Sequence, residues 1–104
     1  MKTEGQTLFF INSVAARQGW EVNNEFIDSL TPGLTKNFNT YGYYLCPCRD
    51  GSNSREQDKD IICPCSYAAA DIKEFGHCYC ALYLSPDFKK TGRQPQSIPE
   101  RRDN

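Results

Sequence analysis

Six cysteines, grouped as three Cys-x-Cys pairs, constrain this chain more than any other feature of its sequence. The pairs are Cys46-Pro47-Cys48, Cys63-Pro64-Cys65 and Cys78-Tyr79-Cys80, and the chain has no other cysteine. Two cysteines one residue apart do not easily bond to each other, because one intervening residue hardly allows the Cα separation and torsion of a disulfide. Three pairs within 35 residues fit a metal or an iron–sulfur cluster, which needs four thiolates. Two thiols are then left over as a redox couple.

The length and the charge of the chain limit the number of domains and the kinds of partner that it can have. With 104 residues we expect one domain, small enough for a cofactor that ties loops together to contribute to its stability. Its 12 basic and 13 acidic residues nearly cancel, which argues against a nucleic-acid or membrane binder, since both rely on a strong basic field. We expect its partners to be proteins or small molecules.

The sequence shows neither a signal peptide nor a membrane span. The apolar run from Leu8 to Ile11 is interrupted by Asn12 and Ser13, and no stretch approaches the roughly 20 apolar residues that cross a bilayer. We therefore expect a cytoplasmic protein. Clustered cysteines in a reducing compartment are more often metal-bound or catalytic than structural disulfides.

Helical periodicity dominates the first half of the chain. A first helix is expected from Thr7, as its N-cap, to about Gln18, with Gly19 as its stop. A second is expected to begin at Asn23 or Asn24. It repeats apolar residues at helical spacing: Phe26, Ile27, Leu30, Leu34 and Phe38. Pro32 lies within that run, so this helix should kink there or restart with Thr31 as a new N-cap.

Short connections are expected in the second half. Ser52 or Asn53 would cap a solvated helix between the first two pairs, and residues 68–75 form another helix candidate closed by Gly76. Residues 81–84 are apolar and are followed by a turn. Residues 91–104, with two prolines and a charged end, are expected to be a disordered tail. The fold class is therefore mainly α, a small single domain whose cysteines lie on loops between short helices.

Counting thiolates does not choose between zinc and a [4Fe–4S] cluster, because both take four. The two remaining cysteines favour a redox role, since a structural zinc site has no need of them. A structural metal site stays open as the alternative. A disulfide-stapled secreted domain fits less well, given the missing signal peptide.

The order of the motifs resembles a known family. The segments Leu45-Cys-Pro-Cys-Arg49, Cys63-Pro-Cys65 and Gly76-His-Cys-Tyr-Cys80, the last followed by Ala81-Leu-Tyr-Leu-Ser-Pro-Asp87, resemble the catalytic (beta) chain of ferredoxin:thioredoxin reductase over most of residues 8 to 88. Here 14 and 12 residues separate the pairs, whereas the chloroplast-type enzymes have a longer first spacer and a shorter second. Their third pair is Cys-His-Cys. These departures indicate a bacterial or archaeal type of this ferredoxin-dependent disulfide reductase.

The resemblance implies roles for all six cysteines. Four of them would bind a [4Fe–4S] cluster: Cys46, Cys63, Cys65 and Cys78. Cys48 and Cys80 would form the redox-active disulfide beside it, with Cys48 as the exposed nucleophile and Cys80 as the thiol on the cluster side. The resemblance also implies a catalytic-chain-like domain over residues 1–90, ahead of the tail 91–104.

The implied function is that of an iron–sulfur disulfide reductase. A ferredoxin-like donor would deliver electrons one at a time, and thioredoxin or a similar protein disulfide would receive them. A small second subunit is left open. His77, the sole histidine, is a candidate proton shuttle near the disulfide, or else a residue that packs near a helix end or faces solvent. Tyr79 is expected to shield the cluster. The alternative function is a non-catalytic zinc-binding interaction module.

Overall fold

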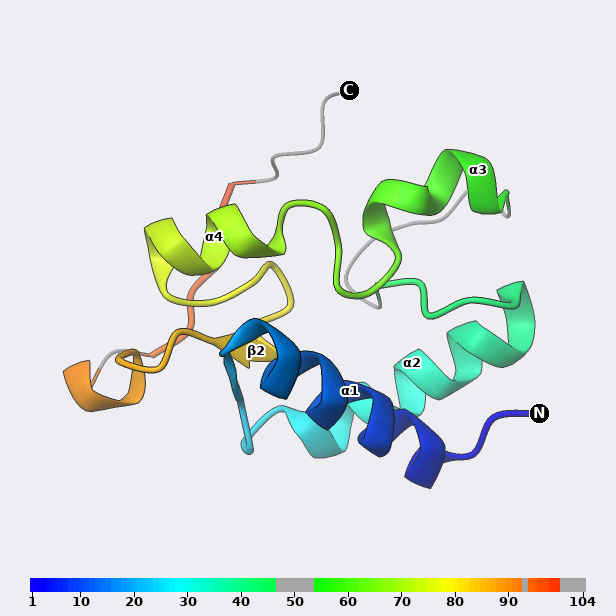
Figure 1. Cartoon of the computed structure of the whole chain (residues 1–104), viewed down its shortest axis with the longest axis horizontal. Helices are drawn as coiled ribbons and strands as arrows, with labels where there is room; N and C mark the ends of the chain where they lie inside the picture. The colour runs from blue at the N-terminus through cyan, green and yellow to red at the C-terminus, as the bar shows by residue number, and fades with distance from the viewer. Residues whose placement is uncertain (47–53, 93, 100–104) are drawn as a thin grey trace.

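Helices α1 (Glu4–Gln18) and α2 (Ile27–Tyr41) pack against each other and run in opposite directions (Figure 1). The computed structural model describes residues 1–46, 54–92 and 94–99. Between the helices, the hydroxyl of Thr7 is hydrogen-bonded to that of Thr35 at 2.7 Å. The mainly helical, small single domain expected from the sequence is confirmed.

Helix α1 begins four residues earlier than expected. Thr3 caps it in a capping box, in which the Gln6 amide donates to the Thr3 hydroxyl at 3.2 Å and the Thr3 amide donates to the Gln6 side chain at 2.9 Å. The prediction of Thr7 as the cap is therefore wrong, because the reciprocal Thr3–Gln6 pair satisfies the orphan amides one turn earlier. The expected end at Gln18, with Gly19 in the left-handed conformation, is confirmed.

Helix α2 starts later than expected and continues through Pro32. The carbonyl of Asn23 accepts hydrogen bonds from the Phe26 and Ile27 amides at 3.1 and 3.0 Å, which forms a turn ahead of the helix. The restart at Thr31 is wrong, because the Thr31 hydroxyl donates to the Ile27 carbonyl at 2.6 Å within one continuous helix. Packing of the apolar face of α2 against α1 offsets the single hydrogen bond that Pro32 cannot make.

Two short helices follow in the second half of the chain. Helix α3 (Arg55–Asp58) is capped by the Ser54 hydroxyl and runs into the 3₁₀ turn η1 (Lys59–Ile61). The caps expected for this helix, Ser52 and Asn53, lie outside the described residues. Helix α4 (Ala68–Phe75) ends at Gly76, as the sequence predicts.

A two-stranded antiparallel sheet was not expected from the sequence. Strand β1 (Glu21–Val22) pairs with β2 (Tyr83–Leu84), with Glu21 opposite Leu84 and Val22 opposite Tyr83. This pairing brings the segment after the third cysteine pair to the end of α1, while α4 lies on the other side of β2 (Figure 1). The turn η2 (Lys89–Thr91) follows the sheet.

The main hydrophobic core joins these elements to the cysteines. Buried side chains from α1, α2 and α4 pack together with three cysteines: Ile11, Val14, Ala15, Leu34, Ala68, Ile72, Cys63, Cys65 and Cys78. Because the cysteines belong to the core itself, their positions depend on the packing of the helices.

Gly76 closes α4 under a tight steric constraint. Its φ is 88°, and a Cβ at this position would collide with the ring of Phe88. Gly42 ends α2 with the same φ of 88°, but a Cβ added there would meet nothing within 4 Å. The two glycines therefore share the backbone requirement and differ in the space around them.

We expect Gly76→Ala to lower the free energy of unfolding by about 2–5 kcal/mol, the sum of left-handed strain and overpacking. Gly42→Ala should cost only the strain, about 1–2 kcal/mol. Urea unfolding of the two variants measures the difference. Equal losses would contradict the proposed collision with Phe88.

Candidate functional site

Five cysteines, from all three pairs, line one small cavity beside the start of α4. They are Cys46, Cys63, Cys65, Cys78 and Cys80, and the wall is completed by Pro64, Ala68, Tyr79, Leu82 and Tyr83. All five are at most 9% exposed. Cys48, the sixth, lies outside the described residues. The sequence-predicted convergence of the cysteine pairs is therefore observed for every cysteine that the structure describes.

The first two pairs are joined through the backbone. Leu45 and Ile62 form an antiparallel bridge. On either side of it, the Cys46 amide donates to the Ile61 carbonyl at 3.0 Å and the Cys63 amide donates to the Tyr44 carbonyl at 2.7 Å. These bonds place Cys46 and Cys63 at one wall of the cavity, although 16 residues lie between them.

The third pair lies on a turn that β2 and Asn23 hold in place. The Cys78 amide donates to the Tyr83 carbonyl at 3.1 Å, and the Ala81 amide donates to the Cys78 carbonyl at 2.8 Å. Ala81 has a φ of 61°, a left-handed conformation that is unfavourable for a residue other than glycine. The buried side-chain amide of Asn23 donates to the Ala81 carbonyl at 2.9 Å. Asn23 therefore stabilises the strained residue next to Cys80.

Burial determines the protonation of the cysteine thiols. It raises the pKa of Cys63 well above its usual value and that of Cys78 to about 12, and in both cases the loss of hydration is the largest cause. Nearby thiols add to the effect. Without a positive group beside them, these thiols are therefore neutral at physiological pH. A cation bound in the cavity would reverse this preference and stabilise the thiolates.

The donor set fits an iron–sulfur cluster in its chemistry. The cavity offers several thiols and apolar or aromatic walls, which suits soft, thiolate-bound iron. Among the described residues, no three His, Cys, Asp or Glu side chains are grouped closely enough to hold a single metal ion. In a [4Fe–4S] cluster each thiolate binds a different iron atom, so its sulfurs lie farther apart than the ligands of one ion. The free space is about 20 Å³, so the cavity would have to widen to hold a cluster while the thiols still face it.

Similarity to known proteins covers nearly the whole chain. The family described as the ferredoxin thioredoxin reductase catalytic beta chain matches residues 2–102. The chain belongs to this family. The family assignment made from the cysteine motifs is thus confirmed.

Several relatives carry the same description. The catalytic chain of ferredoxin-thioredoxin reductase from Synechocystis is 33% identical over 69 residues, which cover 64% of this chain and 54% of the relative. That of Porphyra purpurea is 29% identical over 82 residues, or 75% and 66% of the two chains. The chloroplastic chain of Spinacia oleracea is 33% identical over 64 residues, or 60% and 42%. The chain thus spans between 42% and 66% of the length of these three relatives.

In the structure Cys80 contacts Cys46, which the family resemblance makes a cluster ligand. Its sulfur lies 2.7 Å from that of Cys46, farther than the roughly 2.05 Å of a disulfide bond. The family resemblance pairs Cys80 with Cys48, which lies two residues from Cys46. That pairing and the four-ligand set stay predictions.

His77 is held at both ring nitrogens. It is 2% exposed, its Nδ1 lies 2.7 Å from the Cys78 carbonyl, and its Nε2 lies 3.2 Å from the backbone amide of Gln96. Since the Gln96 amide is a donor, Nε2 accepts and Nδ1–H donates to Cys78. This arrangement fits a neutral histidine that packs beside the third pair of the family motif. Its catalytic role, and the boundary between residues 1–90 and 91–104, stay predictions.

Two acidic residues that hold the chain near the first two pairs were not identified from the sequence. Asp58 was expected on a solvated helix, but it is fully buried and accepts a hydrogen bond from the Tyr43 hydroxyl at 2.6 Å. Asp60 likewise accepts one from the Tyr67 hydroxyl at 2.6 Å. These bonds fix the chain on either side of Cys46 and Cys63. No sequence pattern distinguishes Asp58 from its exposed neighbours.

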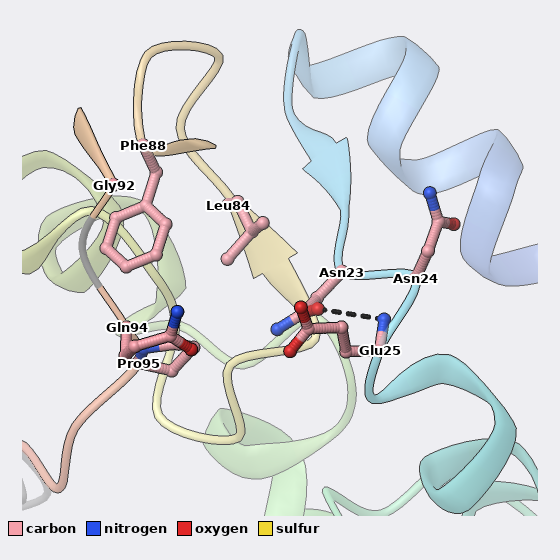
Figure 2. A pocket seen from close by; sticks show the side chains of 8 residues that line it. All are labelled: Asn23, Asn24, Glu25, Leu84, Phe88, Gly92, Gln94 and Pro95. Atoms are coloured by element: carbon pink, nitrogen blue, oxygen red, sulfur yellow. Dashed lines mark hydrogen bonds between the residues drawn. The ribbon is translucent and has the colours of Figure 1, made fainter. Parts of the chain in front are cut away.

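A separate cleft of about 380 Å³ lies next to the sheet. Figure 2 shows that it is bordered by Leu84 and Phe88 on one side and by the Asn23–Glu25 turn on the other, where the Glu25 amide donates to the Asn23 side-chain oxygen at 3.1 Å. No described cysteine lines it.

None of the described helices is both long and apolar enough to cross a bilayer.

The Tyr43–Asp58 bond predicts a specific pH dependence. The hydrogen bond to Asp58, followed by burial and the Asp58 charge, raises the pKa of Tyr43 from 10.0 to about 12. The folded protein holds this proton more tightly than the unfolded chain, so the contribution of Tyr43 to stability is complete below pH 10 and is lost between pH 10 and about 12.

Urea unfolding between pH 9 and pH 11 measures this effect. We expect the wild-type protein to lose stability more steeply above pH 10 than Tyr43→Phe, which lacks the ionising hydroxyl. Tyr41→Phe, which removes the hydroxyl of the ring stacked on Tyr43, should keep most of the wild-type pH dependence, because Tyr41 is only a minor cause of the raised pKa of Tyr43. The same pH dependence in Tyr43→Phe and the wild type would contradict the assignment.

Proposed function

We propose that this chain is an iron–sulfur disulfide reductase, which takes electrons from a ferredoxin-like protein and passes them to thioredoxin or a similar protein disulfide. The observation that carries the proposal is the convergence of five cysteines from three motifs in one buried cavity. Membership of the ferredoxin thioredoxin reductase catalytic family supports it. The cytoplasmic location stays a prediction.

Four of the cysteines would hold a [4Fe–4S] cluster: Cys46, Cys63, Cys65 and Cys78. Their burial at 5–9% exposure supports this, because a buried thiol is a poor nucleophile as long as it stays protonated and a good ligand once iron displaces the proton. A bound cluster would supply one-electron transfer between the donor and a nearby disulfide.

Cys48 and Cys80 would carry out the exchange with the substrate. The Cys48 thiolate attacks one sulfur of the partner's disulfide and forms a mixed disulfide, while the other partner sulfur leaves and takes up a proton. Cys80 then attacks the Cys48 sulfur, which releases the partner as a dithiol and leaves a Cys48–Cys80 disulfide. Two electrons and two protons restore this pair. The burial of Cys80, at 9% exposure, suits the inner, resolving thiol.

A one-electron donor has to act twice for each disulfide reduced. A ferredoxin-like protein is the donor that the family name supports, and thioredoxin is the acceptor. The relatives are named as catalytic chains, which supports a small second subunit as a partner. His77, beside Cys78, stays the candidate proton shuttle for thiol formation, but its Nε2 would first have to give up the hydrogen bond from the Gln96 amide and take up a proton.

A trapping experiment tests the proposed exchange. We expect Cys80→Ser to accumulate a stable mixed disulfide through Cys48 with a thioredoxin that lacks its own resolving cysteine, because the adduct cannot be resolved. Cys48→Ser should capture no partner. Peptide mapping of the crosslink identifies the sulfur. Capture through Cys80 would overturn the roles of the two cysteines, and absence of capture by all variants, with no disulfide reduction by the wild type, would overturn the function.

The different roles proposed for Cys46, as a ligand, and Cys48, as the nucleophile, give a second test. Cys46→Ser should lose most of its bound iron, because a hydroxyl is a poor substitute for a thiolate on iron. Cys48→Ser, two residues away, should retain its iron and lose disulfide reduction. Iron content and reductase activity are measured on the same preparations. Loss of iron from Cys48→Ser alone would show that the two roles are reversed.

A further inference from the structure

Tyr83 contacts two of the proposed ligands at once. It is 1% exposed and is one of the largest fully buried side chains of the described chain. Its backbone amide donates to the Cys78 sulfur at 3.4 Å, and its hydroxyl lies 3.8 Å from the Cys63 sulfur. A single residue therefore links the second and third cysteine pairs.

The position of the Tyr83 ring is fixed from several sides. Strand pairing places Tyr83 opposite Val22, and its carbonyl accepts a hydrogen bond from the Cys78 amide at 3.1 Å. The Trp20 ring packs against it with 5.4 Å between ring centres. The hydroxyl thus points at the Cys63 sulfur because the backbone and the ring are both held in place.

The direction of the hydrogen bond depends on the state of Cys63. A neutral thiol can donate its proton to the tyrosine oxygen, whereas a thiolate has no proton and can only accept. Once Cys63 binds iron as a thiolate, the Tyr83 hydroxyl becomes the donor. Hydrogen bonds to cysteine sulfurs are one of the factors that set the reduction potential of an iron–sulfur cluster.

We propose that Tyr83 is a positioning residue that raises the reduction potential of the cluster by donating a hydrogen bond from its hydroxyl to the Cys63 sulfur. This inference rests on the proposed function, since it needs a cluster held by these cysteines. Reduction adds negative charge to a cluster and its sulfurs. A donor aimed at a sulfur therefore stabilises the reduced state more than the oxidised state, and the potential becomes more positive.

Tyr83→Phe tests the inference, because it removes the hydroxyl and leaves the ring in place. In anaerobically purified full-length protein we expect wild-type iron content and a cluster midpoint potential more negative than that of the wild type, measured by redox titration. The control is Tyr44→Phe. Tyr44 is also buried, but its hydroxyl is hydrogen-bonded to that of Thr7 at 3.2 Å. Its midpoint should equal the wild-type value.

The outcomes separate the inference from the proposed function. A Tyr83→Phe variant with full iron and an unchanged midpoint overturns the inference alone, as does an equal shift in Tyr44→Phe. A wild-type protein that binds no iron overturns both. If Tyr83→Phe does not retain iron, fluorotyrosine is incorporated at position 83 alone, in the otherwise unchanged chain. Its more acidic hydroxyl is a stronger donor, so the midpoint should become more positive, and an unchanged midpoint overturns the inference.

Discussion

The burial of five thiols in one cavity is the constraint on which the rest of the structure depends. Taking a thiol out of water raises its pKa, as at Cys78, whose pKa rises to about 12, so the cavity favours neutral sulfur until a positive group enters. The helices, the Leu45–Ile62 bridge and the two-stranded sheet all serve to hold the three cysteine segments against each other. Stability and ligand binding are therefore coupled, because the same cysteines belong to the hydrophobic core.

The contacts around the third pair show how the fold prepares the site. Asn23 binds the carbonyl of Ala81, whose left-handed backbone follows Cys80 directly. Tyr83 binds Cys78 through its backbone and Cys63 through its hydroxyl. Asn23 directly follows β1 and Tyr83 lies in β2, so a sheet of only two short strands positions the side of the cavity that carries Cys78 and Cys80.

The sequence predicted the elements that depend on local patterns. Capping residues within a few positions predicted the end of α1 at Gly19 and the whole of α4. The cysteine motifs predicted that the three pairs come together. The start of α2 was misplaced because Asn23, a good cap by type, closes a separate turn ahead of the helix, where its oxygen accepts from the Glu25 amide while its side-chain NH2 holds Ala81, 58 residues away. The burial of Asp58 was missed for a similar reason, since its partner Tyr43 lies across the first cysteine segment. Long-range contacts of this kind leave no local pattern.

The metal content of the wild-type protein, purified without oxygen, tests the proposed cluster most directly. We predict a brown protein with broad absorbance at about 400 nm, and about four iron atoms with matching acid-labile sulfide in each chain, as expected for a [4Fe–4S] cluster. A colourless protein that contains zinc, and takes up no iron and sulfide on reconstitution, would contradict it. That result would identify the cysteine cavity as a structural metal site.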